Sequence, residues 1–183
     1  MKESYYAGCY WLARQEPIEA CAQRLAGFLQ LVSPLEPTWN RWHQAAGSFK
    51  KARQLQVQPD ATTLAKLLGR KAHRFKDMSS FWLWAGETED ETSGFDGNCG
   101  SASTRVASFC VLNSLTSGQV AQRVLTAPVL TGVVRAMALA WEPEFALATS
   151  HEHRDLTVTD EFPKAGTYVG WVMYFAHFRG TVP

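Results

Sequence analysis

The chain has 183 residues, of which 46% are hydrophobic and 19% charged, and its formal net charge is +1. This apolar content excludes a disordered chain, because burying it offsets the conformational entropy lost on folding. The near-neutral charge excludes a protein that coats nucleic acid with most of its surface. A chain of this length is expected to form a single domain over residues 1–183.

The beginning of the chain, Met1 to Tyr10, lacks the basic start and continuous apolar stretch that export requires. No apolar run approaches the length that spans a bilayer, so we expect a cytoplasmic protein. In that compartment cysteines stay reduced, and in a chain of this size they are usually buried. Buried reduced thiols are therefore expected at Cys9, Cys21, Cys99 and Cys110.

The first part of the chain predicts a strand followed by a helix. Residues 5–11 are rich in aromatic side chains that favour strands. Over residues 17–32 apolar side chains recur every three or four positions, which predicts an amphipathic helix ending before Pro34. Residues 33–58 then predict a long connection, with a short helix near residues 38–44.

A second, shorter helix is expected after this connection. Asp60 is placed to cap it, its apolar residues run to Leu68, and Gly69 is placed to end it. A third helix is expected from Thr126 to Trp141, ended by Pro143.

The second half of the chain also carries strand patterns, separated by polar residues. An acidic run at residues 87–91 and a glycine-rich stretch at residues 94–100 predict a polar loop. Strands are predicted at residues 80–85, 104–112, 145–149 and 168–175. Strands and helices do not alternate regularly, so we expect an α+β fold: a largely antiparallel mixed sheet with two main helices packed on one face.

Two segments resemble chemical sites. His151, Glu152 and His153, with Asp155 or Asp160 nearby, offer metal-ligand side chains. A metal needs a further ligand from elsewhere, so a polar turn between two strands is the favoured interpretation. The stretch Gly94–Gly100 resembles a phosphate-binding loop, but it lies beside acids that repel phosphate and lacks a nucleotide motif. No catalytic residue, metal or cofactor is predicted, and a non-enzymatic protein is expected.

Charge is distributed unevenly along the middle of the chain. From Trp39 to Lys76 there are nine Lys or Arg and one acid, whereas from Asp77 to Gly100 there are six acids and no base. Acids beside aromatic side chains favour a surface that binds a basic protein, because aromatics anchor interfaces and carboxylates steer association. The predicted partner-binding residues are Glu87, Glu89, Asp90, Glu91, Asp96, Trp82 and Trp84. Alternation places Trp82 and Trp84 on one face of their strand, but it does not say which face is exposed.

An alternative function rests on the basic segment. In residues 49–76, Lys and Arg side chains are interspersed with Phe49, His73 and Phe75. Such a composition can hold a nucleic-acid backbone through its positive charges and stack on nucleobases through its rings. No recognised nucleic-acid module accompanies it, so nucleic acid is not the expected partner.

Several short segments spread over the chain resemble the immunity protein 52 family of bacterial toxin systems. They are Tyr5-Tyr6-Ala7-Gly8-Cys9-Tyr10-Trp11 with Arg14 and Glu16, Cys21-Ala22-Gln23-Arg24-Leu25, Phe81-Trp82-Leu83-Trp84, Ala140-Trp141-Glu142-Pro143 and Gly170-Trp171-Val172-Met173-Tyr174. The resemblance implies a non-enzymatic antitoxin in the cytoplasm that binds and blocks a cognate toxin. It further implies a toxin of the restriction-endonuclease-like nuclease class, delivered by type VI secretion, and it supplies no catalytic residues.

Overall fold

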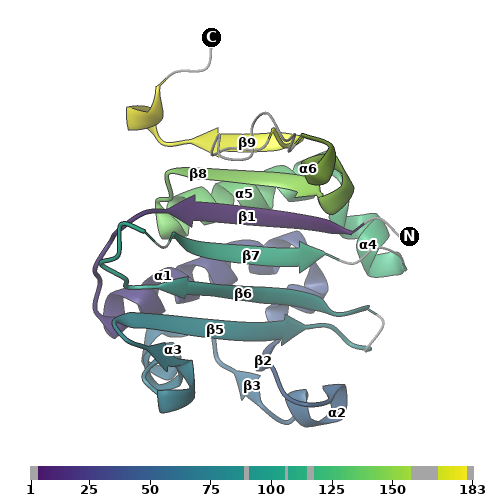
Figure 1. Cartoon of the computed structure of the whole chain (residues 1–183). Coiled ribbons are helices and arrows are strands. Elements are labelled where there is room, and N and C mark those ends of the chain that lie inside the picture. The colour runs from purple at the N-terminus through teal and green to yellow at the C-terminus, as the bar shows by residue number, and fades with distance from the viewer. Residues whose placement is uncertain (1–3, 89–90, 106, 115–117, 158–168, 181–183) are drawn as a thin grey trace.

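The computed structural model describes residues 4–88, 91–105, 107–114, 118–157 and 169–180. Within these ranges nine strands form one sheet in the order β3-β2-β5-β6-β7-β1-β8-β9, with β4 paired to β5 (Figure 1). Every pairing in it is antiparallel. The strands are β1 Tyr5–Trp11, β2 Trp42–Gln44, β3 Gln56–Val57, β4 Arg74–Phe75, β5 Met78–Ala85, β6 Ser93–Cys99, β7 Ser108–Ser114, β8 Phe145–Ser150 and β9 Val172–Phe175.

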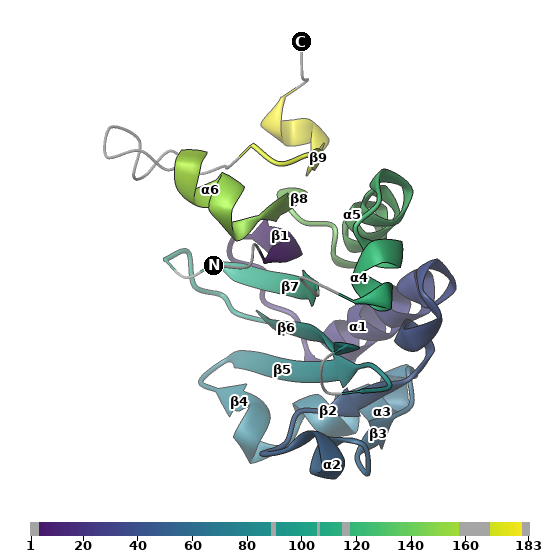
Figure 2. The same cartoon turned by 90° about the vertical axis from the view of Figure 1, so that its right-hand side faces the viewer.

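The longer helices cover one face of this sheet (Figure 2). The α-helices are α1 Ile18–Val32, α2 Phe49–Ala52, α3 Ala61–Leu68, α4 Gln119–Val124, α5 Ala127–Trp141 and α6 His151–Thr157. Figure 2 shows the sheet on edge, with α1, α3 and α5 on one side and α6 on the other. The predicted α+β class, the antiparallel sheet and the two main helices on one face are therefore confirmed.

The core lies between the sheet and helices α1 and α5. Seven apolar residues of α1 are buried, as its three- and four-residue periodicity predicts. Phe28 of α1 stacks on Phe95 of β6, with ring centroids 4.3 Å apart. Trp141, at the end of α5, stacks on Trp11 of β1 at 5.4 Å. Bulky aromatics thus join both helices to the strands that they cover.

The helices predicted at residues 17–32, 60–68 and 126–141 form as α1, α3 and α5. Asp60 accepts a hydrogen bond of 2.8 Å from the backbone N–H of Thr63 and so caps α3. Within the connection 33–58 only a 3-10 turn at Pro37–Asn40 matches the predicted short helix, and Trp42–Gln44 is strand β2. All four cysteines are free and buried, as expected. None of the helices in the described ranges has the length and hydropathy needed to cross a bilayer.

The glycine-rich stretch is not a loop, and that prediction is wrong. Residues 93–99 are strand β6, which lies in the middle of the sheet between β5 and β7. A Cβ atom at Gly97 would lie 2.5 Å from the carbonyl oxygen of Phe109, so glycine here permits close approach of β7. Glycine weakens the local preference for a strand, but pairing on both sides overrides it.

Two further predictions about the second half need correction. His151–Arg154 begins helix α6 and is not a turn between strands. The predicted strand 104–112 begins later, at Ser108, and the strand predicted from residue 168 begins at Val172. Residue 168 itself lies outside the described residues.

Candidate functional site

The structure decides which face of β5 is exposed. Phe81, Leu83 and Ala85 are buried under the helices, whereas Trp82 on the opposite face has 56% of its surface exposed. The rings of Trp82 and Trp84 meet edge to face with centroids 5.9 Å apart. Both predicted aromatic anchors therefore lie on the open face of the sheet, away from α1 and α5.

A shallow depression runs along β6 on this open face. Strand alternation places Gly94, Asp96 and Asn98 on its floor. The neighbouring strands supply taller side chains on either side, so we name this surface the β6 trough. Its residues are Gly94, Asp96, Asn98, Trp82, Trp84, Phe109 and Asn113.

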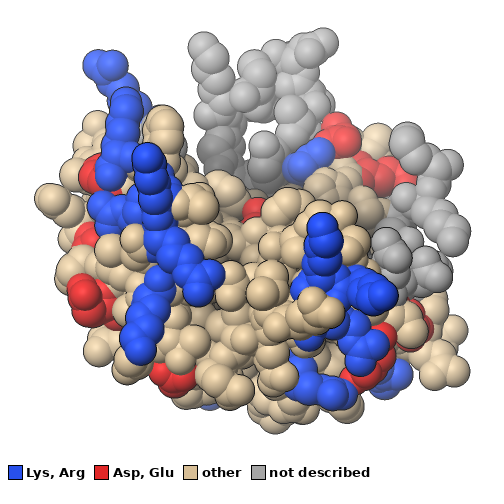
Figure 3. Space-filling model, turned by 90° about the horizontal axis from the view of Figure 1, so that it is seen from below, with Lys and Arg blue, Asp and Glu red and all other residues tan. Residues whose placement is uncertain are grey.

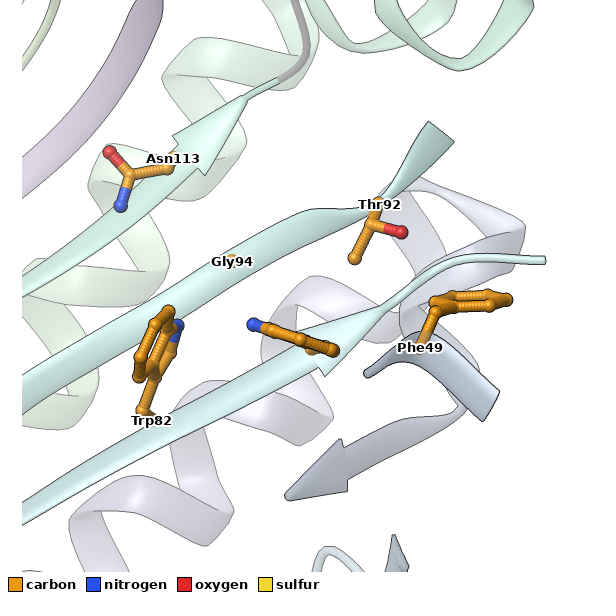
Figure 4. Close-up of a pocket in the computed structure, with 6 residues that line it drawn as sticks. Phe49, Trp82, Thr92, Gly94 and Asn113 are labelled. Carbon is orange, nitrogen blue, oxygen red and sulfur yellow. The ribbon is translucent and has the colours of Figure 1, made fainter. Parts of the chain in front are cut away.

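Two adjoining pockets make up the trough, with volumes of about 370 and 440 Å³. They share Trp82 and Asn113. Figure 4 shows the first pocket, where Gly94 lies between Trp82 on β5 and Asn113 on β7 and Phe49 of α2 lies at the far end. A Cβ atom at Gly94 would lie 3.9 Å from Nε1 of Trp82, which is ordinary contact. The floor is low at this position because residue 94 has no side chain.

Asp96 occupies the floor of the second pocket. Its Oδ1 accepts a hydrogen bond of 3.1 Å from Nδ2 of Asn113. Burial among the neighbouring side chains raises the pKa of Asp96, and the hydrogen bond from Asn113 offsets part of that effect. The carboxylate is thus poorly solvated, and a cationic group placed beside it would stabilise the charged form.

Asn98 lies two residues farther along the same floor. Its side chain is 7% exposed, and its Oδ1 is buried without a hydrogen-bond partner among the described residues. Because a buried acceptor without a partner is unfavourable, this oxygen is suited to receive a donor from outside the chain.

The acids of the loop before β6 have internal partners. Glu87 forms an ion pair with Arg41. The Oε1 of Glu91 accepts a hydrogen bond of 2.9 Å from the backbone N–H of Gln119, at the start of α4. Glu89 and Asp90 lie outside the described residues. Among the predicted acids that the structure describes, Asp96 is therefore the one that faces the trough and forms no ion pair.

The basic side chains of residues 41–76 lie at the other end of the sheet from β9. All nine are exposed. Figure 3, which views this end, shows Lys and Arg in two groups, one toward α3 and one toward α2, with uncharged surface between them. The segment therefore does not form one continuous basic stripe.

The ring of His151 packs against Tyr6 of β1. Its ring lies 4.7 Å from that of Tyr6, and burial lowers the pKa of the imidazole, assisted by the charge of Arg154. Across the described ranges, no group of three or more His, Cys, Asp or Glu side chains has a geometry that could hold a metal.

Comparison with protein families gives a match over nearly the whole chain. The model of immunity protein 52 matches residues 3–183. The chain belongs to the immunity protein 52 family. Among curated proteins no relative matches it.

A solved structure of the Pseudomonas aeruginosa T6SS protein PA0821 is similar to this immunity family member, with a TM-score of 0.42 and 17% sequence identity. The match covers 81% of this chain and 40% of that chain. This chain thus spans less than half the length of that protein.

Most of the segments that carry the family resemblance meet at the ends of α1 and α5. Glu16 accepts hydrogen bonds from Arg14 at 3.2 Å and from Arg24 at 2.8 Å. Arg24 also donates to the carboxylate of Glu142 at 2.9 Å. This cluster joins β1, α1 and α5 and so has a structural role in this immunity protein, whereas Trp82 and Trp84 face outward.

Four trough residues were missed by the sequence reasoning: Gly94, Asn98, Phe109 and Asn113. A signal was present, because residues 94, 96 and 98 alternate as in a strand with one polar face. The glycines at positions 94 and 97 obscured it, since glycine clusters usually mark loops.

Proposed function

We propose that this chain neutralises a cognate toxin by binding it directly through the open sheet face, with the β6 trough at the centre of the interface. The observation that carries the proposal is the exposure of Trp82 beside the poorly solvated carboxylate of Asp96. Membership of an immunity family supports the toxin as partner.

The surface combines the two properties that tight protein interfaces need. An affinity near 1 nM corresponds to about 12 kcal/mol, which normally requires buried aromatic or arginine anchors. Trp82 and Trp84 offer apolar area with few rotatable bonds, so little entropy is lost when a partner covers them. Asp96 adds a charge that selects a basic partner.

We infer further that the toxin is a nuclease of the restriction-endonuclease-like class, delivered by type VI secretion and blocked in the cytoplasm without any catalysis by this chain. The charge of the trough supports a nuclease, because Asp96 is the one charged side chain among its described lining residues. Nucleases bind a polyanion through basic residues, and an acidic, aromatic surface is complementary to such a cleft.

Co-expression with the protein encoded immediately upstream tests this proposal. We expect the two chains to co-purify and the immunity protein to restore growth of cells that make the toxin. Trp82→Ala is expected to weaken the complex at least tenfold, as for other central aromatic anchors. Phe178→Ala is the matched control, because Phe178 is 73% exposed and lies after β9, away from the trough. Failure of the wild-type chain to bind and to rescue growth would refute the proposal.

Nucleic-acid binding through residues 49–76 is the alternative. It is favoured by the exposure of every Lys and Arg side chain in the segment. It predicts salt-sensitive binding of labelled DNA or RNA that Lys71→Glu with Arg74→Glu reduces. Absence of a mobility shift at low salt would remove this alternative.

A further inference from the structure

The pocket at the Asp96 end of the β6 trough is lined by a carboxylate with one hydrogen-bond donor and by a buried amide oxygen with none. It has a volume of about 440 Å³. Asp96 receives one hydrogen bond, from Asn113, to its Oδ1, and nothing in the described part of the chain donates to Oδ1 of Asn98. Asp96 lies opposite Trp82 of β5 and Asn98 lies opposite Phe109 of β7, and both aromatic residues line the pocket.

The chemistry of this pocket is complementary to a cation with several donors. Asp96 is the one charged group among the described lining residues, and no base from the rest of the described chain pairs with it. Trp82 on one side and Phe109 on the other line the pocket with aromatic rings, which attract cations. The raised pKa of Asp96 agrees with this view, since burial without a cation disfavours its charged form.

Asp96 and Asn98 lie two positions apart on β6, which favours a cation with well-separated donors. Side chains at positions i and i+2 of a strand start about 6.5 Å apart. An ammonium nitrogen forms hydrogen bonds of about 3 Å, so it bridges these two residues only where both side chains lean toward one point. A guanidinium group carries donors on opposite edges of a plane and reaches farther across.

We infer that the pocket formed by Asp96 and Asn98 is a subsite for the guanidinium group of an arginine side chain that the toxin supplies. Asp96 accepts from one edge of the group and Asn98 from the other, while Trp82 covers its face. The assignment of the arginine to the toxin rests on the proposed function.

Titration with a small arginine compound tests the subsite without the toxin. We would follow the side-chain amide signals of Asn98 and Asn113 by NMR while adding Nα-acetyl-arginine methylamide. A saturable shift of both signals is expected, with binding at least about tenfold weaker for the lysine analogue. The neutral citrulline analogue should cause no saturable shift. Equal binding of the citrulline analogue, or no saturable shift with the arginine compound, would overturn the inference.

Variants of the two acceptors refine this test. Asp96→Asn and Asn98→Ala should each reduce binding of the arginine compound at least tenfold, because each removes one acceptor. Glu19→Gln is the matched control, since Glu19 is an exposed acid in the first turn of α1, in the helical layer. Unchanged binding by both acceptor variants, with their fold verified by circular dichroism, would contradict the assignment.

The complex with the toxin separates failure of this inference from failure of the proposed function. Each arginine of the toxin is changed to lysine in turn. Binding of each toxin variant is measured to the wild-type chain and to Asp96→Asn, and the binding constants form double-mutant cycles. One arginine should show coupling of about tenfold or more with Asp96. A stable wild-type complex with no coupled arginine would overturn the inference and leave the proposed function intact. If no complex forms, the proposed function fails and the titration alone decides the subsite.

Discussion

Arg24 of α1 donates a hydrogen bond of 3.1 Å to the carbonyl oxygen of Ala140, in the last turn of α5. The carbonyl groups of a final turn lack partners within their own helix, so this contact caps α5 from a neighbouring helix. The same guanidinium binds Glu16 and Glu142, which ties the two longest helices together at one point.

Arg24→Ala is expected to lower the free energy of unfolding by about 1–3 kcal/mol, because it removes charge-assisted hydrogen bonds that are partly buried. Denaturation in urea measures the change. Gln23→Ala on the exposed side of the same helix is the control and should shift stability by less than about 0.5 kcal/mol. Equal effects of the two substitutions would show that the cluster does not hold the helices together.

Glu36 should make the stability of the fold depend on pH in the acid range. It is 1% exposed, and its carboxylate accepts bonds of 2.8 and 2.7 Å from Nε and Nη2 of Arg123. The hydrogen bonds from Arg123 lower its pKa in the folded state below the ordinary carboxyl value. The stability from this pair is therefore complete above the unfolded pKa of about 4.3 and is lost as the pH falls through the lower, folded pKa.

Unfolding of the wild-type chain and of Glu36→Gln across this pH range checks the sign. We expect Glu36→Gln to be less stable at pH 7, because Arg123 loses its charged partner. The difference should shrink as the pH falls through the folded pKa of Glu36. A difference that stays constant down to the lowest pH would show that ionisation of Glu36 does not contribute.

Asp96→Asn should separate binding from stability. Burial raises the folded pKa of Asp96, so its ionisation opposes folding once the pH rises above the ordinary carboxyl pKa. At neutral pH we expect the variant to be as stable as the wild-type chain or more so, while toxin binding falls at least tenfold. Thermal melts and a binding titration measure the two effects. Loss of stability together with loss of binding would identify Asp96 as a structural residue.

Two glycines of β6 should respond in opposite ways. In Gly94→Leu the new side chain points into the trough, where a Cβ atom meets nothing closer than 3.9 Å. The fold should therefore persist, while the leucine blocks toxin binding. Gly97→Ala faces the helices, where a Cβ atom would lie 2.9 Å from Sγ of Cys110, so we expect a loss of about 1–3 kcal/mol in stability. Growth rescue and thermal melts distinguish them. A Gly94→Leu variant that still protects cells would place the interface outside the trough.

The local pattern of the sequence was sufficient for the helices. Periodicity located α1 and α5, and the capping residue Asp60 located α3, because helix formation depends on residues within a few positions of one another. Alternation likewise placed Trp82 and Trp84 on the face of β5 opposite to Phe81, Leu83 and Ala85, but it did not say which face is buried.

Only the tertiary structure decided that residues 93–99 are a central strand and that Trp82 faces outward. Strand pairing joins distant residues: β6 lies between β5 and β7, and Asp96 is opposite both Trp82 and Val111. No local pattern specifies such partners, and the glycines that allow close packing of β6 are the residues that locally favour a loop. The sequence determined which segments could be helices and which side chains share a strand face, whereas the trough depends on register, which is set by packing across the whole sheet.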